Sequence, residues 1–257
     1  MKYYIGDDYR EVNIDPKMDF IGEGIETKVY QAGDYVLKFF KDQDIGNISR
    51  KVEFLCQLSE ICTKRIVMPR EMVYKSHNNI FDFINEYFRY KLYGLEPIKN
   101  AQGKYYCGYT SLYIHSGNKP INLIDTDKIY ENFGCMSEDF ELLNRAGIVA
   151  SDTHIDNIIF DEHGNMFIVD IGSFYKSISN ASYFNNIAFN FIVKEVITDG
   201  MSMRDNEIRI IRNLIRDYLS SRLDEIHTLE FLKQELCKYS TIEEYQEYLT
   251  KKIIRGK

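Results

Sequence analysis

The chain has 257 residues, 44% hydrophobic and 28% charged, enough to bury a sizeable core in one large domain or two lobes. Its formal net charge of −7 argues against a nucleic-acid-binding surface, which needs a concentrated basic face. The five cysteines are scattered and include no C-x-x-C pair, so reduced thiols are favoured over a disulfide framework or a zinc site. No apolar run approaches the roughly 18 residues that span a bilayer, and we expect a cytoplasmic protein without a membrane span.

The N-terminal half is predicted to be rich in strands. Residues 18–40 indicate three strands, separated by a glycine-containing loop and by a turn at residues 32–34. Two further strand-like units, each with a polar turn, follow over residues 71–88 and 95–114. Between them and the first strands, residues 48–64 predict a helix, because small and apolar residues recur at helical spacing: Val52, Leu55, Cys56, Ser59 and Cys62.

The C-terminal half is predicted to be mainly helical. Residues 124–146 predict a helix, with Gly134 as the place where it could break. Residues 158–169 predict a hairpin, because two apolar runs flank a polar turn. From about residue 184 onward, apolar stripes alternate with charged faces, which is typical of packed helices. A chain that is β-rich at one end and helical at the other suggests two lobes.

The stretch from 147 to 174, GIVASDTHIDNIIFDEHGNMFIVDIGSF, sets three polar side chains at fixed spacings around this hairpin. Asp152 lies five residues before Asn157, and Asp170 opens an Asp-Ile-Gly sequence after the second apolar run. Each residue alone is more often a turn or cap residue. The ordered set resembles the D-x-x-x-x-N and D-F-G sequences of the protein-kinase-like superfamily, which includes Hanks-type protein kinases and the aminoglycoside and choline phosphotransferases.

This resemblance covers roughly residues 18–200. It implies an α+β, bilobal protein-kinase-like fold. The N-lobe (1–115) would be β-rich with one main helix, and the C-lobe (116–257) would be helical. It also implies ATP and Mg²⁺ as cofactors and an unidentified hydroxyl-bearing acceptor, with no nucleic-acid partner. In this family pattern Asp152 orients the acceptor hydroxyl and accepts its proton. Asn157 and Asp170 supply the hard oxygen ligands that Mg²⁺ prefers.

Two N-terminal sequences resemble the nucleotide-binding parts of the same family. In GEGIETKV, Gly22 and Gly24 are followed by Thr27, where a third glycine would stand, and by Val29 in the valine position. Such a turn lets backbone N–H groups approach phosphate oxygens. Lys38 in VLKFF resembles the lysine that contacts the α- and β-phosphates. A strand turn with two glycines and a lysine at a strand end are also common surface features.

Two assignments stay open from the sequence. Glu53 is the preferred partner of this lysine over Glu60, because it lies beside the apolar stripe of its helix, although a solvated glutamate is nearly as good an interpretation. The hinge that binds adenine is placed near Leu112 and Ile114 in CGYTSLYIHSG. Residues 84–88 are its competitor, since hinge contacts are largely made by the backbone.

The departures from the family pattern bear on the acceptor. Ala150 and Ser151 stand where protein kinases carry His-Arg, whose arginine gathers a phosphorylated activation loop. His154 matches the D-x-H-x-x-N form of aminoglycoside-type phosphotransferases, where it either reaches the γ-phosphate or packs the loop. No A-P-E sequence can occur, because no proline follows Pro120. The next helix shows no obvious counterpart of the aspartate that braces the catalytic loop in protein kinases.

Three functions follow from the resemblance. An ATP-dependent protein serine/threonine kinase is the first hypothesis, and a small-molecule kinase of the aminoglycoside or choline type is the second. The third is a pseudokinase that binds partners without turnover, which the retention of Lys38, Asp152, Asn157 and Asp170 argues against. A cluster of carboxylates near Asp152 would favour a cationic small molecule, whereas a groove for an extended peptide would favour a protein acceptor.

Overall fold

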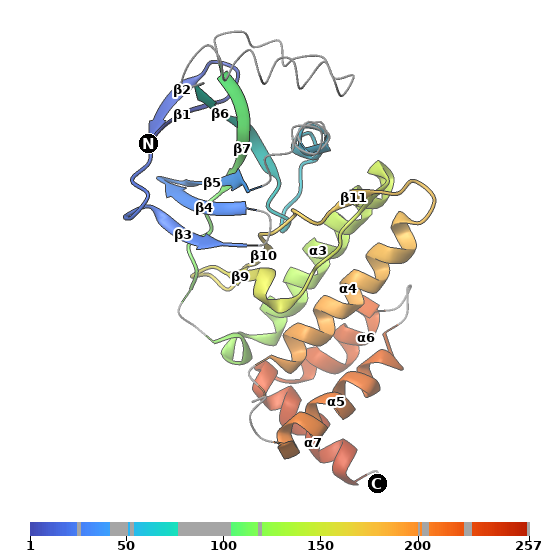
Figure 1. Cartoon of the computed structure of the whole chain (residues 1–257). Coiled ribbons are helices and arrows are strands. Elements are labelled where there is room, and N and C mark those ends of the chain that lie inside the picture. The colour runs from blue at the N-terminus through green and yellow to red at the C-terminus, as the bar shows by residue number, and fades with distance from the viewer. Residues whose placement is uncertain are drawn as a thin grey trace. The chain divides into compact units, whose positions relative to one another are not determined.

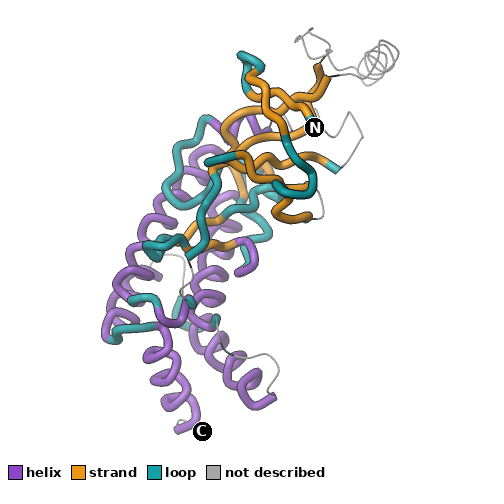
Figure 2. Tube along the Cα trace, turned by 90° about the vertical axis from the view of Figure 1, so that its left-hand side faces the viewer, coloured by secondary structure: helices purple, strands orange, loops and turns teal. Residues whose placement is uncertain are grey.

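The chain forms two compact units. The N-terminal unit comprises Met1–Cys62 and Met68–Tyr113, and the C-terminal unit comprises Thr63–Val67 and Ile114–Lys257. Strands gather in the first unit and helices in the second, so the protein is mixed α+β (Figure 2). The structure is a computed structural model that describes residues 1–24, 27–41, 51, 54–76, 104–117, 120–199, 201, 206–223 and 228–255.

The N-terminal unit is built on a curled antiparallel sheet of seven strands in the order β2-β1-β6-β7-β5-β4-β3 (Figure 1). The three strands predicted over residues 18–40 are confirmed as β3, β4 and β5. The hairpin of β1 and β2 was not predicted, because its strands are short. The strands are β1 Lys2–Ile5, β2 Arg10–Asn13, β3 Phe20–Glu23, β4 Thr27–Ala32, β5 Tyr35–Phe40, β6 Pro69–Ser76 and β7 Lys104–Leu112.

The core of this unit lies around β5. Four successive residues of β5, from Val36 to Phe39, are buried, so this strand is covered on both faces. Side chains from β1, β5 and β6 form one cluster with Ile14, which follows β2: Tyr3, Ile14, Leu37, Phe39 and Val73. Strand β7 approaches β5 so closely that a Cβ at Gly108 would lie 2.2 Å from the Lys38 carbonyl oxygen. Glycine at this position therefore allows the two strands to pair.

The predicted helix over 48–64 is described only in part. Residues 54–59 are helical, whereas residues 61–64 are not, so the helix ends earlier than expected. The expected apolar stripe is wrong in part: its member Leu55 is buried, together with Leu58, but Cys56, Ser59 and Cys62 are exposed. Two leucines bury more apolar area than cysteine and serine do, and they set the buried face. Glu53 and the competing hinge at 84–88 lie outside the described residues.

The C-terminal unit is mainly helical, and α3 and α4 pack side by side (Figure 1). Helix α3 runs without interruption through Gly134, so the expected break there is wrong. It begins after Asp125, which caps Asp127 N–H, and ends at Gly147 in the left-handed region with φ 67°. The helices are α3 Thr126–Ala146, α4 Ala181–Thr198, α5 Asn206–Ser220, α6 Thr228–Glu235 and α7 Ile242–Arg255.

Short elements complete this unit and position the three spaced residues Asp152, Asn157 and Asp170. The predicted hairpin is confirmed as β9 and β10, which pair antiparallel. Strands β8 and β11 form a second antiparallel pair. No helix in the described ranges is both long and apolar enough to cross a membrane. The short elements are η1 Ile121–Leu123, β8 Ile148–Val149, η2 Ile155–Asn157, β9 Ile158–Phe160, β10 Met166–Ile168, β11 Tyr175–Lys176 and η3 Leu236–Lys238.

Candidate phosphotransfer site

The loop after β8 carries the first of the three spaced polar residues. Asp152 has φ 58°, a left-handed conformation that is uncommon for a residue other than glycine. The side-chain amide of Asn157, at the end of η2, donates from Nδ2 to the Asp152 carbonyl oxygen at 2.7 Å. This hydrogen bond closes the five-residue loop and orients the Asn157 amide. Strained backbone held by such a contact is a feature of functional loops.

His154 lies between two carboxylates of the same loop. Its Nε2 is 3.2 Å from Asp152 Oδ1, and its Nδ1 is 3.6 Å from Asp156 Oδ2. The Asp152 side chain is 57% exposed and that of His154 is 39% exposed, so both face solvent. The imidazole contacts the carboxylate expected to act on the acceptor. It also lies 3.5 Å from Asn157 Nδ2, which holds the loop together.

The second loop begins at Asp170 and is tied to the first. Val169 N–H donates to the Asn157 carbonyl oxygen at 2.9 Å, which brings the residue before Asp170 next to the end of η2. Asp170 Oδ1 accepts from Gly172 N–H at 3.0 Å. Ser151 and Ser173 exchange hydrogen bonds: each hydroxyl donates to the carbonyl oxygen of the other residue. Ser151 therefore joins the two loops directly.

The buried side-chain amide of Asn185, on α4, braces the loop that carries Asp152. Asn185 is fully buried, and its Oδ1 accepts from Ala150 N–H at 2.7 Å. Its Nδ2 donates to the Ile148 carbonyl oxygen at 2.8 Å and to Asn144 Oδ1 at 2.7 Å. Sequence reasoning found no bracing residue in this helix because it looked for an aspartate. The signal was a polar residue in an apolar helix, on the face that the helix buries.

A cavity of about 360 Å³ opens beside Asp152. One wall is the loop after β8, and the other is made of apolar side chains of α4 together with Tyr175 of β11. The volume is in the range of small ligand pockets. Its lining residues are Val149, Ala150, Ser151, Asp152, Thr153, His154, Tyr175, Phe184, Ile187, Ala188 and Phe191.

The side chains of Asn157 and Asp170 suit Mg²⁺ better than a metal ion whose ligands all come from the protein. No group of three or more His, Cys, Asp or Glu side chains within the described ranges could hold a metal ion. Asn157 and Asp170 contribute one amide oxygen and one carboxylate from two hydrogen-bonded loops. Mg²⁺ is usually bound by one or two such groups, with waters and substrate phosphates as its remaining ligands.

In the N-terminal unit, the sheet register aligns three of the predicted nucleotide-binding residues. Gly22 on β3 pairs with Val29 on β4, and Val29 pairs with Lys38 on β5. A Cβ built at Gly22 would meet no atom within 4 Å, and one at Gly24 would meet only the Thr27 carbonyl oxygen at 4.0 Å. Packing against the described residues therefore does not require glycine at either position.

The turn between β3 and β4 is closed by two contacts. Gly24 N–H donates to the Thr27 carbonyl oxygen at 2.9 Å. Lys41 donates from Nζ to the Gly24 carbonyl oxygen at 2.5 Å and pairs with Glu23. Sequence reasoning did not single out Lys41, which follows β5. The Lys41 side chain places an ammonium group beside the glycine turn.

Lys38 is buried, with a relative exposure of 7%. Its Nζ lies 5.9 Å from the centre of the Tyr109 ring, a cation–π distance. A lysine at the end of a strand is normally solvated, so its burial within β5 is the property expected of a residue with a specific charged partner. The rival of Glu53, Glu60, is exposed at the end of its helix.

The two residues proposed for the hinge fall in different units. Leu112 is the last residue of β7 in the N-terminal unit, whereas Ile114 begins the second segment of the C-terminal unit. Tyr113 N–H between them donates to the Asp34 carbonyl oxygen at 3.0 Å. The structure therefore places the predicted hinge where the chain leaves one unit and enters the other.

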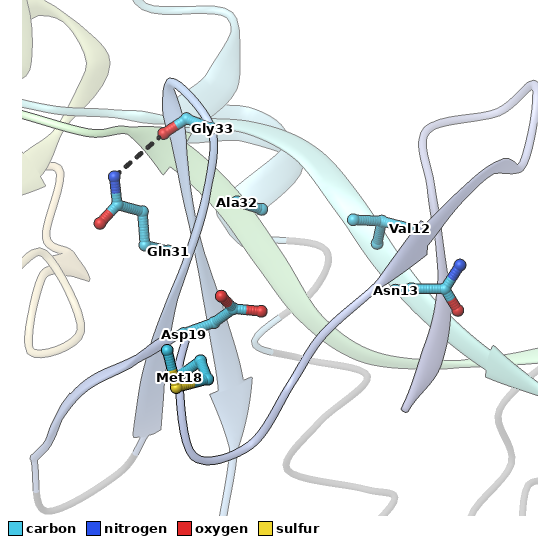
Figure 3. Close-up of a pocket in the computed structure, with 7 residues that line it drawn as sticks. All are labelled: Val12, Asn13, Met18, Asp19, Gln31, Ala32 and Gly33. Atoms are coloured by element: carbon cyan, nitrogen blue, oxygen red, sulfur yellow. Dashed lines mark hydrogen bonds between the residues drawn. The ribbon is translucent and has the colours of Figure 1, made fainter.

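A second cavity, of about 450 Å³, lies at the opposite end of β4 from the glycine turn (Figure 3). Figure 3 shows Asp19 and Met18 on one side of it, and Gln31 donating to the Gly33 carbonyl oxygen at 3.4 Å. Val12 and Asn13 of β2 line the other side. It holds one carboxylate and no basic side chain, so it lacks the charge that a phosphate would need.

No model of a known protein family matches the chain. The comparison with curated proteins also finds no match.

Proposed function

We propose that this chain is a Mg²⁺- and ATP-dependent phosphotransferase with a bilobal, protein-kinase-like fold that phosphorylates a serine or threonine hydroxyl. The observation that carries the proposal is the joined pair of loops in the C-terminal unit. Asn157 closes the Asp152 loop through Nδ2 and holds Val169, next to Asp170, through its carbonyl oxygen. Together these contacts hold the Asp152 loop, the Asn157 amide and the residue before Asp170 next to one another.

In the proposed reaction, the acceptor oxygen forms a bond to the γ-phosphorus of ATP. The bond from that phosphorus to the oxygen bridging the β- and γ-phosphates breaks, and ADP leaves. The acceptor proton passes to the Asp152 carboxylate and then to solvent. Asp152 suits this role because it is exposed and held in a fixed conformation. His154, 3.2 Å away, orients this carboxylate.

Asn157 and Asp170 would hold Mg²⁺, which neutralises charge on the β- and γ-phosphate oxygens when bound. In the N-terminal unit, the absence of a side chain at Gly22 and Gly24 would let phosphate oxygens approach the backbone. Buried Lys38 and the ammonium of Lys41 would contribute positive charge. The five free cysteines are compatible with the reducing cytoplasm as the compartment of this protein.

A small-molecule kinase is the second candidate function. The observation that favours it is the contact between His154 and Asp152, since D-x-H-x-x-N resembles aminoglycoside-type phosphotransferases. A protein acceptor is preferred, because the cavity beside Asp152 is walled by apolar side chains rather than by the carboxylates that a polycation needs.

The first test of the proposal measures ATP binding and ATP hydrolysis. We expect wild-type protein to bind ATP only with Mg²⁺ present and to hydrolyse it slowly, as measured by calorimetry and phosphate release. Asp170→Ala should reduce hydrolysis by about 10²–10³-fold, because one charged group at such a site contributes roughly this much. Glu162→Ala, at an exposed carboxylate in the same hairpin, is the matched control and should behave as wild type. Equal hydrolysis by Asp170→Ala and wild type would contradict the proposal.

A further inference from the structure

Helix α4 exposes an apolar face near its N-terminus. Four large side chains on it are between 39% and 56% exposed: Tyr183, Phe184, Ile187 and Phe191. At 100° per residue these positions fall within about a third of the helix circumference. Residues 181–193 contain no charged side chain, although a helix face in contact with water normally carries several. An exposed patch of this kind is typical of an interaction site.

This apolar face continues into the cavity that contains Asp152. Phe184, Ile187 and Phe191 line that cavity and also belong to the exposed face. Tyr175 of β11, 43% exposed, extends the apolar lining from a different element. A group held against this wall would therefore lie beside the carboxylate proposed to receive the acceptor proton.

The charges around the cavity restrict its occupant. Among the residues that line it, Asp152 is the carboxylate and His154 the imidazole, and they contact each other. A polycationic acceptor would find one carboxylate there, already beside an imidazole, and an apolar wall that cannot solvate its ammonium groups. An occupant with an apolar body and one hydroxyl group matches the wall and the carboxylate together.

The length of the apolar face favours a polypeptide over a small molecule. From Tyr183 to Phe191 the helix rises about 12 Å, since each residue adds about 1.5 Å. Tyr183, the most exposed of the four at 56%, lies outside the cavity lining. A small alcohol filling 360 Å³ would leave it in water, whereas a peptide chain would cover it.

We propose that the cavity beside Asp152 and the apolar face of α4 bind the acceptor as a polypeptide segment, in which a large apolar side chain neighbours the phosphorylated serine or threonine. The hydroxyl lies at Asp152, and the neighbouring apolar side chain packs on Ile187 and Phe191. This inference rests on the proposed phosphotransferase function and specifies its substrate class.

The test uses a library of peptides with a fixed central serine or threonine and degenerate flanking positions. The full-length protein, Mg²⁺ and γ-labelled ATP are incubated with the library, and phosphorylated peptides are sequenced. We expect enrichment of Phe, Leu, Ile or Met over charged residues at one flanking position by about 10-fold or more, the selectivity that an apolar contact typically gives.

Ile187→Glu provides the specificity test. A carboxylate in the cavity wall should reverse the preference at that position from apolar residues to Lys or Arg. The change is made at a side chain that is 49% exposed, so the protein should still fold, which thermal unfolding checks. Ile254→Glu, at a 58% exposed isoleucine of α7, is the matched control and should keep the apolar preference.

The outcomes separate this inference from the function on which it rests. If Asp170-dependent transfer from ATP reaches a small hydroxyl compound but no peptide is phosphorylated, the peptide acceptor is wrong and the phosphotransferase function stands. Phosphorylation without an apolar preference, or with one that Ile187→Glu leaves unchanged, also overturns the inference. If wild-type protein neither binds nor hydrolyses ATP, both proposals are wrong.

Discussion

Asn185 illustrates how one buried amide can position a loop that carries chemistry. It joins the end of α3, strand β8 and the residue two places before Asp152 through three hydrogen bonds. Asn185, Ile148 and Ala150 are all buried, whereas Asn144 is partly exposed. Such fully satisfied buried networks fix a single arrangement, and they are costly to break.

We predict that Asn185→Ala lowers the free energy of unfolding by about 2–3 kcal/mol, because it leaves the Ala150 N–H and the Ile148 carbonyl oxygen without their partner. Urea denaturation measures this change. Asn186→Ala, one position along α4 and only partly buried, is the control and should change stability by less than about 0.5 kcal/mol. Equal stability of both variants would contradict a bracing role.

The polar residues of the site could be predicted in part. The resemblance of their order and spacing to the protein-kinase-like pattern singled out Asp152, Asn157 and Asp170. Asn185 could not be found this way, since 33 residues separate it from Asp152 and its role depends on which face of α4 is buried. Cys56 was wrongly placed on the buried stripe for the same reason: local periodicity did not show which face of its helix packs against the core.

The hairpin of β9 and β10 depends on the turn at Asp161. Its Oδ1 accepts from the N–H groups of His163 at 2.9 Å and Asn165 at 2.8 Å, and its Oδ2 accepts from Asn165 Nδ2 at 2.8 Å. Burial raises the pKa of Asp161, but these hydrogen bonds outweigh burial and the net pKa lies below the ordinary carboxyl value. The ionised form therefore stabilises the turn that connects Asn157 to Asp170.

Asp161→Ala should lower the free energy of unfolding by about 1–2 kcal/mol at neutral pH. Because the folded-state pKa is lowered, the contribution of Asp161 is complete above its unfolded pKa of about 4 and is lost as pH falls through the folded pKa. The difference between variant and wild type should therefore shrink below about pH 4, as measured by urea unfolding at several pH values. A difference that grows on acidification would rule out this linkage.

Helix α3 anchors the short segment 63–67 through one carboxylate. Asp139 has a relative exposure of 1% and accepts from the N–H groups of Lys64 at 2.8 Å, Arg65 at 2.5 Å and Ile66 at 3.1 Å. The anchored segment runs beside β10, where Val67 N–H donates to the Ile168 carbonyl oxygen at 2.8 Å. The carboxylate thus replaces the strand partner that these N–H groups lack.

We expect Asp139→Ala to lower the free energy of unfolding by about 2–4 kcal/mol, since three backbone donors lose their acceptor. Glu138→Ala removes an exposed ion pair with Lys64 from the same turn of the helix and should cost less than about 1 kcal/mol. Chemical denaturation of both variants makes the comparison. Similar losses would show that the buried contacts contribute no more than the surface pair.

Elements with strong local patterns were the ones predicted correctly. The strands over residues 18–40 and the β9–β10 hairpin alternate apolar runs with turn residues, and both are confirmed. The β1–β2 hairpin was missed because each strand has four residues, too few to establish a period. Gly134 was expected to interrupt α3, but the packing of Phe133 and Met136 in the core outweighs the low helix propensity of glycine.

At the scale of the whole molecule, the α+β character could be predicted because strands and helices occupy separate parts of the chain. The division of the contacts into two compact units is consistent with that separation. The apolar face of α4 could not be predicted as exposed, because its residues have the composition of a buried helix. Burial depends on what covers a helix, and a local pattern does not contain that information.

The central claim is that the linked loops at Asp152 and Asp170 transfer phosphate from ATP to a hydroxyl. The most direct measurement is transfer from γ-labelled ATP with Mg²⁺ by wild type and Asp152→Asn, with the protein itself, a generic basic protein, an apolar-flanked serine peptide and an aminoglycoside panel as acceptors. We expect wild type to label a protein or peptide, and Asp152→Asn to lose this label while ATP binding persists. Label transferred equally by Asp152→Asn, or none to any acceptor, would contradict it.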